Sequence, residues 1–343
     1  MSLPASAEAP SVAISNRAMN AVAAHRRRYL RETLLAYLFL LPAGIIIFTF
    51  HLLPVFYAFY ISLHRWILVK GGFIGLNNFV RVFKDPAFYQ SLQVTVFYVL
   101  GTVPLTIILS VIIAYLLFQK IRGLSLFRTI YFLPYIVSSV AAGAVWTWIF
   151  NPRFGPVNMI LNAIGIASQK WLLEPRGVFE LIGRAFGIAV PAWAAGPSQA
   201  LVAIMVFAIW QVMGFDIVVF LAGLGAIPNE LYEAARIDGA SGWQLFRRIT
   251  IPMLSPTTFF VLIISIIGSF QAFNHIYVMT SSAGGSLGGP LGTTSTLTIY
   301  MFRQFWDNQN MGYGAALAFV LFAIILTLTI LQNQILEKRV HYN

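Results

Sequence analysis

The chain has 343 residues, of which 59% are hydrophobic and 10% are charged, and its formal net charge is +11. Ordinary soluble domains carry about 25% charged residues, so a deficit of this size excludes a surface that faces mainly water and indicates an integral membrane protein. Cysteine is absent, which excludes disulfide bonds, thiolate metal sites and cysteine nucleophiles.

The N-terminal segment holds the one cluster of basic residues in the sequence, between His25 and Arg31. Such a cluster just before an apolar run keeps the N-terminus in the cytoplasm. The other Lys and Arg residues are scattered, without a basic face that carries stacking aromatics, so we expect no nucleic-acid partner. We expect residues 1–33 to form a cytoplasmic tail, with the first 24 residues poorly ordered.

Six apolar runs are long enough to cross the hydrocarbon core as helices, which takes about 20 residues each. They are 34–63, 92–118, 129–150, 200–227, 256–280 and 312–335. No strand-like alternation competes with these runs. The sequence therefore predicts an all-α integral membrane protein, a bundle of six helices in the lipid bilayer.

The segments between the runs alternate between the two sides of the membrane. With the N-terminus inside, the cytoplasmic segments hold 13 of the 22 Lys and Arg residues; they are 1–33, 119–128, 228–255 and 336–343. This modest excess agrees with the positive-inside rule and also places the C-terminal tail in the cytoplasm. Segments 64–91 and 151–199 are then outer loops. Within the second, residues 177–193 have apolar residues at roughly helical spacing and predict an amphipathic helix on the outer leaflet.

The cytoplasmic stretch 229–256 is polar although it joins two apolar runs. Asn229 is suited to cap the start of a helix, and Asp238-Gly239 is suited to end it. Ser241 and Gln244 have the spacing of a capping box for a second helix.

Pro252 is expected to break or kink that second helix. Two short helices joined by a glycine turn would form a lever, because anything that grips them moves both attached spans. The alternative from the residues alone is an amphipathic loop that rests on the inner lipid surface.

A motif in this stretch favours the lever over the loop that rests on lipid. Residues 233–252 read EAARIDGASGWQLFRRITIP and match the pattern E-A-A-x3-G-x9-I-x-L-P, except that Ile251 replaces the usual Leu. The stretch resembles the EAA loop of binding-protein-dependent ABC importer permeases, in the carbohydrate branch typified by maltose-type transporters. FIGLNNF (73–79) and WTWIFNPRFGPVN (146–158) are similar to landmarks of the same family.

The resemblance implies a fold, a site and partners. The fold would be a six-helix type I ABC importer transmembrane domain, with a permease core at 92–335 that follows the first transmembrane helix at 34–63. The first EAA helix would be a coupling helix that docks in a cleft of a cytoplasmic ATPase subunit. The coupling residues carried over are Glu233, Ala234, Ala235, Asp238 and Gly239. The partners implied are a sister permease, two ATPase subunits and an extracytoplasmic sugar-binding protein, at a prokaryotic plasma (inner) membrane.

The chain itself lacks an ATP site. A P-loop needs a lysine directly after a glycine, so that backbone amides and the lysine hold phosphates together, and no lysine here follows a glycine. We therefore expect a transport subunit that is not an enzyme and has no cofactor of its own, with ATP bound by the partner ATPase.

Polar residues inside transmembrane spans are costly and suggest functional sites. We therefore assign a substrate pathway to the two spans that flank the EAA loop, at Trp210, Gln211, Asp216, Ser265, Ser269, Gln271 and Asn274. The resemblance implies substrate-facing positions around Trp210, Gln211, Ser265, Ser269 and Gln271, whereas Asp216 and Asn274 are added as polar residues within the spans. For the serines, close helix packing is an equal alternative. Asp216 could pair with the partner permease or lie hydrated near the cytoplasm. The predicted spans contain no Lys or Arg, which favours a neutral oligosaccharide or glycoside over a phosphorylated polyol.

Other functions remain as alternatives. A secondary transporter driven by an ion gradient would need midplane carboxylates and usually an internal repeat, but Asp216 is the only acid within the predicted spans. A membrane enzyme or a metal site is disfavoured, because the five histidines are dispersed and no HExxH, GxSxG or paired-acid motif is present. A glycerol-phosphate-type ABC permease is the third alternative.

Overall fold

The computed structural model describes residues 11–119, 123–283 and 286–336. The chain divides into two compact units, residues 1–60 and 61–343. The expectations for residues 1–10 and for the C-terminal tail at 337–343 lie outside the described residues.

The first unit is helical from its first described residue. Helix α1 spans Ser11–Ile47, a π-helical turn η1 spans Phe48–Leu52, and α2 begins at Leu53 and runs to Ser62, just inside the second unit. The predicted poor order of the first 24 residues is therefore wrong for residues 11–24, because this Ala-rich segment has high helix propensity and continues as a helix into the apolar run. The part from residue 28 to 62 is long and apolar enough to cross a membrane.

The segment predicted as an outer loop at 64–91 is largely structured. It forms an antiparallel hairpin of β1 (His64–Ile67) and β2 (Val69–Phe73), followed by α3 (Asn77–Lys84). Helix α4 (Pro86–Phe118) then begins six residues before the predicted span. It starts there because Asp85 accepts a hydrogen bond from the backbone N–H of Ala87, while Pro86 occupies the first helical position, where no N–H is needed.

Helices α4 and α9 (Gln199–Gly225) form the central pair of the second unit, α5 and α13 pack against this pair, and α16 packs against α13, α15 (Leu297–Trp306) and α3. Glycines on α9 allow the close approach of its neighbours. A Cβ added at Gly214 would lie 2.1 Å from the carbonyl oxygen of Tyr131 on α5. A Cβ at Gly223 would lie 2.4 Å from Oγ1 of Thr257 on α13. Small residues at contacts of this kind let apolar helices pack backbone to backbone.

Two of the predicted spans are broken. The third consists of α5 (Leu124–Ile136) and α6 (Ser139–Ile149), bent by 97°. The fifth, predicted at 256–280, begins as α13 (Ser255–Phe270), which is bent by 62° from the short elements that precede it at residues 242 to 253. The predicted fifth helix is wrong beyond residue 270, because α13 ends there and α14 (Asn274–Ser281) follows after a further break.

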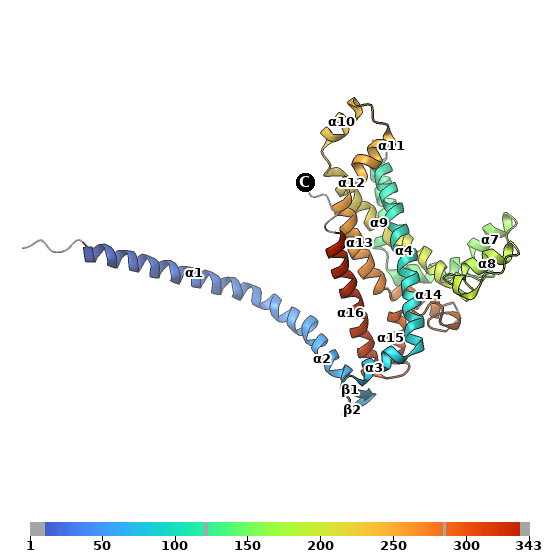
Figure 1. The fold of residues 1–343 in the computed structure, drawn as a ribbon, viewed down its shortest axis with the longest axis horizontal. Coiled ribbons are helices and arrows are strands. Elements are labelled where there is room, and N and C mark those ends of the chain that lie inside the picture. The colour runs from blue at the N-terminus through green and yellow to red at the C-terminus, as the bar shows by residue number, and fades with distance from the viewer. Residues whose placement is uncertain (1–10, 120–122, 284–285, 337–343) are drawn as a thin grey trace, which may run out of the picture. The chain divides into compact units, whose positions relative to one another are not determined.

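The last predicted span is continuous, as α16 (Met311–Leu336). In the described residues, four helices can cross a membrane by length and composition, and there are six spans when each bent pair counts as one. Within the second unit, α10 (Asn229–Ile237) and α11 (Gly242–Leu245) lie at one end of the bundle, and the hairpin lies at the other (Figure 1).

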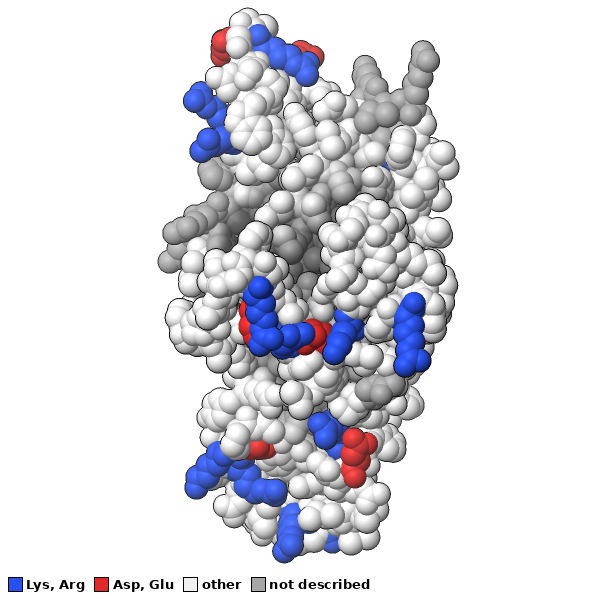
Figure 2. Space-filling model, turned by 90° about the vertical axis from the view of Figure 1, so that its right-hand side faces the viewer, with Lys and Arg blue, Asp and Glu red and all other residues white. Residues whose placement is uncertain are grey.

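The long segment 151–199 forms small elements to one side of the bundle (Figure 1). They are α7 (Pro156–Ala163), η2 (Trp171–Leu173), α8 (Val178–Ala185) and η3 (Ala192–Ala194). The predicted amphipathic helix at 177–193 is thus present but shorter, because Gly187 turns the chain with a φ of +70°. Figure 2 shows charged side chains at both ends and in a belt across the middle, with a mostly uncharged zone above the belt that suits contact with hydrocarbon.

Candidate functional site: an exposed loop and a cavity between broken helices

The EAA stretch forms a helix that is closed by a glycine turn. At the C-terminus of α10, the N–H of Ala240 donates to the carbonyl of Ala235 at 2.9 Å, and the N–H of Gly239 donates to the carbonyl of Arg236 at 3.0 Å. This pair of bonds is a Schellman motif, and it requires the left-handed conformation that Gly239 adopts at φ +79°. Glycine is needed here because a Cβ would strain that backbone.

The second short helix starts with the predicted capping box. The N–H of Gln244 donates to Oγ of Ser241 at 3.4 Å, and the N–H of Ser241 donates to Oε1 of Gln244 at 2.7 Å. The predicted cap at Asn229 is wrong, because Pro228 occupies the cap position and Asn229 is already helical.

Pro252 does not end the second helix either. A π-helical turn, η4 (Phe246–Thr250), leads into α12 (Ile251–Met253), and the bend falls at Leu254. The π turn lies directly before Pro252, where the missing N–H would otherwise leave a gap in the hydrogen-bonding pattern.

The predicted coupling residues gather on this exposed loop. Glu233, Ala234, Asp238 and Gly239 are exposed, and Ala235 is half-buried. None of the charged side chains of the loop forms an ion pair with another described residue. Two large apolar side chains are also exposed, Ile237 at 87% and Trp243 at 67%. The loop therefore presents free charge and apolar area together, which is a surface suited to a protein partner.

The broken spans meet at a second candidate site. At the first break, Val137 and Ser138 have extended backbone between α5 and α6, and the carbonyl of Val137 accepts a hydrogen bond from Nε2 of Gln211 at 3.4 Å. At the second break, residues 271–273 separate α13 from α14. There the carbonyl of Ala272 accepts from Oγ1 of Thr298 on α15 (Leu297–Trp306) at 2.5 Å. Non-helical backbone at membrane depth is tolerated where it is buried in protein or lines a cavity.

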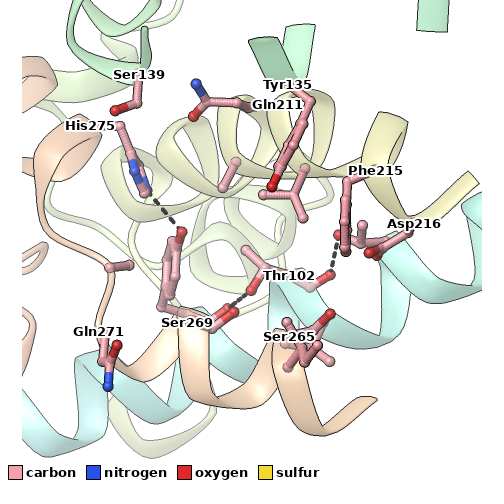
Figure 3. A pocket seen from close by; sticks show the side chains of 18 of the residues that line it. Thr102, Tyr135, Ser139, Gln211, Phe215, Asp216, Ser265, Ser269, Gln271 and His275 are labelled. Atoms are coloured by element: carbon pink, nitrogen blue, oxygen red, sulfur yellow. Dashed lines mark hydrogen bonds between the residues drawn. The ribbon is translucent and has the colours of Figure 1, made fainter. Parts of the chain in front are cut away.

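A cavity of about 370 Å³ lies between these two breaks (Figure 3). Six of the seven predicted pathway residues line it: Gln211, Asp216, Ser265, Ser269, Gln271 and Asn274. The seventh, Trp210, is not part of the lining. Its ring packs against those of Trp146 and Phe207, with centroid distances of 5.3 and 6.0 Å.

The sequence analysis missed the part of the lining that α4 and the first break contribute. These residues are Tyr98, Thr102 and Thr106 on α4, and Tyr135 and Ser139 beside the first break. Phe215 on α9 and His275 on α14 also line the cavity and were not assigned to the pathway. The Tyr98 hydroxyl and Nε2 of His275 are 2.8 Å apart (Figure 3). A signal was available for α4, because its buried hydroxyl residues recur at intervals of four or seven along one helix face: Ser91, Thr95, Thr102, Thr106 and Ser110.

Asp216 is the one carboxylate in the lining. It is 1% exposed, and its Oδ2 has no hydrogen-bond partner among the described residues. The lining contains no Lys or Arg. No group of three His, Cys, Asp or Glu side chains in the described part of the chain could hold a metal ion. The arrangement offers hydrogen-bonding groups on an apolar wall, which is the usual make-up of a small-molecule pathway.

A hydrogen-bond clamp fixes α15, which carries Thr298. The hydroxyls of Tyr300 and Tyr313 both donate to Oδ2 of Asp85. Burial acts to raise the pKa of Asp85, but the hydrogen bonds from the two tyrosines and from the Ala87 N–H, with the charge of Arg81, outweigh it and lower that pKa. Burial and the bond to Asp85 raise the pKa of Tyr300 to about 12. The clamp thus joins α3 and α4 to α15 and α16 through an ionised carboxylate.

The chain matches a known family over most of its length. Residues 95–342 match the family described as binding-protein-dependent transport system inner membrane component. A relative from Thermococcus litoralis, named trehalose/maltose transport system permease protein MalF, is 32% identical over 302 residues, which cover 88% of this chain and 92% of the relative. A relative from Agrobacterium fabrum, named sn-glycerol-3-phosphate transport system permease protein UgpA, is 32% identical over 312 residues, which cover 90% and 97%.

A solved structure shares the fold. It is a chain from the crystal structure of a bacterial alginate ABC transporter in complex with alginate pentasaccharide-bound periplasmic protein, with a TM-score of 0.72 and 22% identity over 90% of this chain and 95% of that one. The predicted fold class, an ABC importer transmembrane domain, is thereby confirmed. The chain belongs to the family of binding-protein-dependent inner membrane transport components, as an ABC importer permease of the sugar or glycerol-phosphate type, and is a transport subunit rather than an enzyme.

Proposed function

We propose that the chain is one of two permease subunits of an ATP-driven importer of oligosaccharides or glycosides. Its partners would be a sister permease, two ATPase subunits and an extracytoplasmic sugar-binding protein. The chain's termini and the α10–α11 loop would lie in the cytoplasm, and segment 151–199 would lie outside. The relative from Thermococcus litoralis, which is named for trehalose and maltose transport, supports a carbohydrate substrate.

The observation that carries this proposal is the self-contained α10–α11 loop. Its fold is held by its own Schellman motif and capping box, while Glu233 and Ile237 remain exposed. The loop is attached at both ends to the helices that line the cavity, α9 and α13. Closure of an ATPase dimer around the loop would therefore tilt the two helices that carry Gln211, Asp216 and Ser269.

The coupling role is tested by two substitutions in the loop. We expect Glu233→Lys and Gly239→Pro to leave the amount of the chain in the membrane unchanged. We expect them to abolish vanadate-sensitive uptake of radiolabelled maltose and to reduce at least tenfold the P-loop ATPase subunit that co-purifies with the full-length chain. The first reverses an exposed charge, which costs several kcal/mol at a charge-complementary contact. The second places proline where φ is positive, which its ring forbids.

Asp307→Lys is the control, because it reverses an exposed charge next to α15, away from the loop, and the ion pair with Arg303 that it breaks is exposed and worth little. It should change neither uptake nor co-purification. If both loop variants retain full uptake and full co-purification, the coupling role is wrong. Uptake that resists vanadate and collapses with an ionophore would instead indicate a secondary transporter.

A further inference from the structure

Asp216 carries the inference, because its carboxyl group is buried beside a cavity without a partner. It lies on α9, 1% exposed, and its Oδ2 has no hydrogen bond to any described residue. None of the ion pairs in the described part of the chain includes it. Buried carboxyl oxygens are almost always satisfied, since leaving one unpaired is costly. Because Asp216 lines the cavity, the missing partner can be a group that enters with a ligand.

The neighbouring hydroxyl groups in the lining point to what that group is. Oγ1 of Thr102 donates to the carbonyl of Tyr98 at 2.7 Å, and Oγ1 of Thr106 donates to the carbonyl of Thr102 at 2.8 Å. A hydroxyl has a single hydrogen to donate, so both threonines can offer the cavity only lone pairs. The α4 side of the cavity and Asp216 on α9 therefore present acceptors (Figure 3).

The cavity also lacks a cationic side chain that would hold an anion. None of its lining residues is Lys or Arg, and Nε2 of His275 is already engaged with the Tyr98 hydroxyl. Phosphate and carboxylate ligands are normally bound by such cations or by convergent donors. In this cavity they would face the carboxylate of Asp216 and two acceptor-only hydroxyls, and the remaining donors, such as the Gln271 amide and the Ser269 hydroxyl, are neutral.

We propose that Asp216 is a recognition residue of the transport cavity, and that the cavity takes a sugar that offers hydrogen-bond donors and carries no negative charge. This inference rests on the proposed import function and narrows its substrate class. A ring hydroxyl or a ring ammonium would donate to Oδ2 of Asp216. A phosphorylated polyol or a uronate would be disfavoured at the same position.

The chain has no cysteine, so one introduced thiol is the only thiol on this chain, and its modification is read from the mass of this chain. The complex that carries Ser269→Cys would be purified from native membranes and placed in lipid nanodiscs. Its introduced thiol would then be modified with two methanethiosulfonate reagents, one that carries a cationic trimethylammonium group and one that carries an anionic sulfonate group. We expect the modification rate with the cationic reagent, divided by the rate with the anionic reagent, to fall on the order of tenfold when Asp216→Asn is added. The reason is that a unit negative charge strongly attracts a nearby cation in a poorly hydrated site. At the exposed control Ser168→Cys the ratio should not respond to Asp216→Asn.

A second arm tests the ligand class by protection of the Ser269→Cys thiol. We expect millimolar maltose, a neutral donor, or glucosamine, a cationic donor, to slow modification more than sn-glycerol 3-phosphate does, and this advantage should disappear with Asp216→Asn. The inference is overturned if the charge ratio is unaffected by Asp216→Asn, or if the two sugars protect no better than sn-glycerol 3-phosphate. The proposed import function fails separately, through the uptake and co-purification of the Glu233 and Gly239 variants, which do not depend on the cavity charge.

Discussion

The α10–α11 loop and the cavity between the broken helices are built in opposite ways. The bonds that form the turn and the cap of the loop join residues three to five positions apart, in the Schellman motif of Gly239 and the capping box of Ser241, and the Tyr232–Thr250 hydroxyl pair spans only 18 positions. The bonds that shape the cavity join residues 26, 74 and 177 positions apart: Thr298 to Ala272, Gln211 to Val137, and Tyr98 to His275. The loop surface proposed to bind an ATPase subunit is thus formed by residues close in sequence. The cavity surface proposed to bind the substrate depends on contacts across the whole bundle.

The largest expected effect is at Gly214, where the wall of the cavity is assembled. Gly214→Ala would place a Cβ 2.1 Å from the carbonyl oxygen of Tyr131, so α5 and α9 must separate. We expect the free energy of unfolding to fall by about 3 kcal/mol, at the upper end of the usual cost of overpacking. Thermal unfolding of the purified chain in detergent measures this.

Gly225→Ala on the same helix is the control, since a Cβ there has no neighbour within 4 Å. If the two alanine variants unfold alike, the contact between α5 and α9 does not set the stability of the bundle. The cavity would then not depend on long-range contacts, and the contrast with the loop would be wrong.

An intermediate effect is expected at the clamp on α15. Asp85→Asn keeps a side chain that can cap α4 but removes the charge that accepts from Tyr300 and Tyr313. We expect a loss of about 1 kcal/mol at pH 7, moderated because the carboxylate is partly exposed. Unfolding in detergent, with Asp307→Asn as the exposed control, measures it.

The same variant has a defined pH dependence. The pKa of Asp85 is lowered from 3.8 in the folded chain, so the carboxylate is stabilising above the unfolded value and loses this contribution as the pH falls through the lower, folded value. The difference between the native chain and Asp85→Asn should therefore be constant from pH 5 to 7 and should shrink below about pH 4. A difference that grows on acidification would contradict the assignment.

The smallest expected effect on global stability is in the loop. Ser241→Ala removes the cap of α11, worth about 1 kcal/mol locally, but α11 can open without unfolding the bundle. Thermal unfolding should be unchanged, while amide hydrogen exchange at Gln244 should speed up about fivefold. The substitution Ser282→Ala, at an exposed serine after α14, should change neither. A large drop in thermal stability with Ser241→Ala would show that the loop is not locally encoded.

The sequence was sufficient for the loop because its signals are local. The glycine turn and the Ser241–Gln244 capping box were both predicted from short-range rules, and the structure contains both. The error at Asn229 was also local, because the rigid backbone of Pro228 took the cap position one residue earlier. Six apolar runs were likewise readable, since length and hydropathy suffice to define a candidate span.

The cavity could be predicted only in part. Neither break could be read from its own residues, because Val137-Ser138 and the stretch 271–273 contain no glycine or proline. The carbonyls at these breaks are satisfied by Gln211 and Thr298, from segments that are distant in sequence. Trp210 lies outside the lining for a related reason, since its ring packs against aromatic neighbours on α6 and α9 that hydropathy does not reveal.

The self-sufficient fold of the α10–α11 loop has an evolutionary consequence. Because its turn and cap need nothing from the cavity, we expect substitutions in the cavity lining to leave the shape of the loop unchanged, and substitutions in the loop to leave the cavity unchanged. If the loop binds ATPase subunits as proposed, a lineage of such permeases could change its substrate while it keeps the same ATPase.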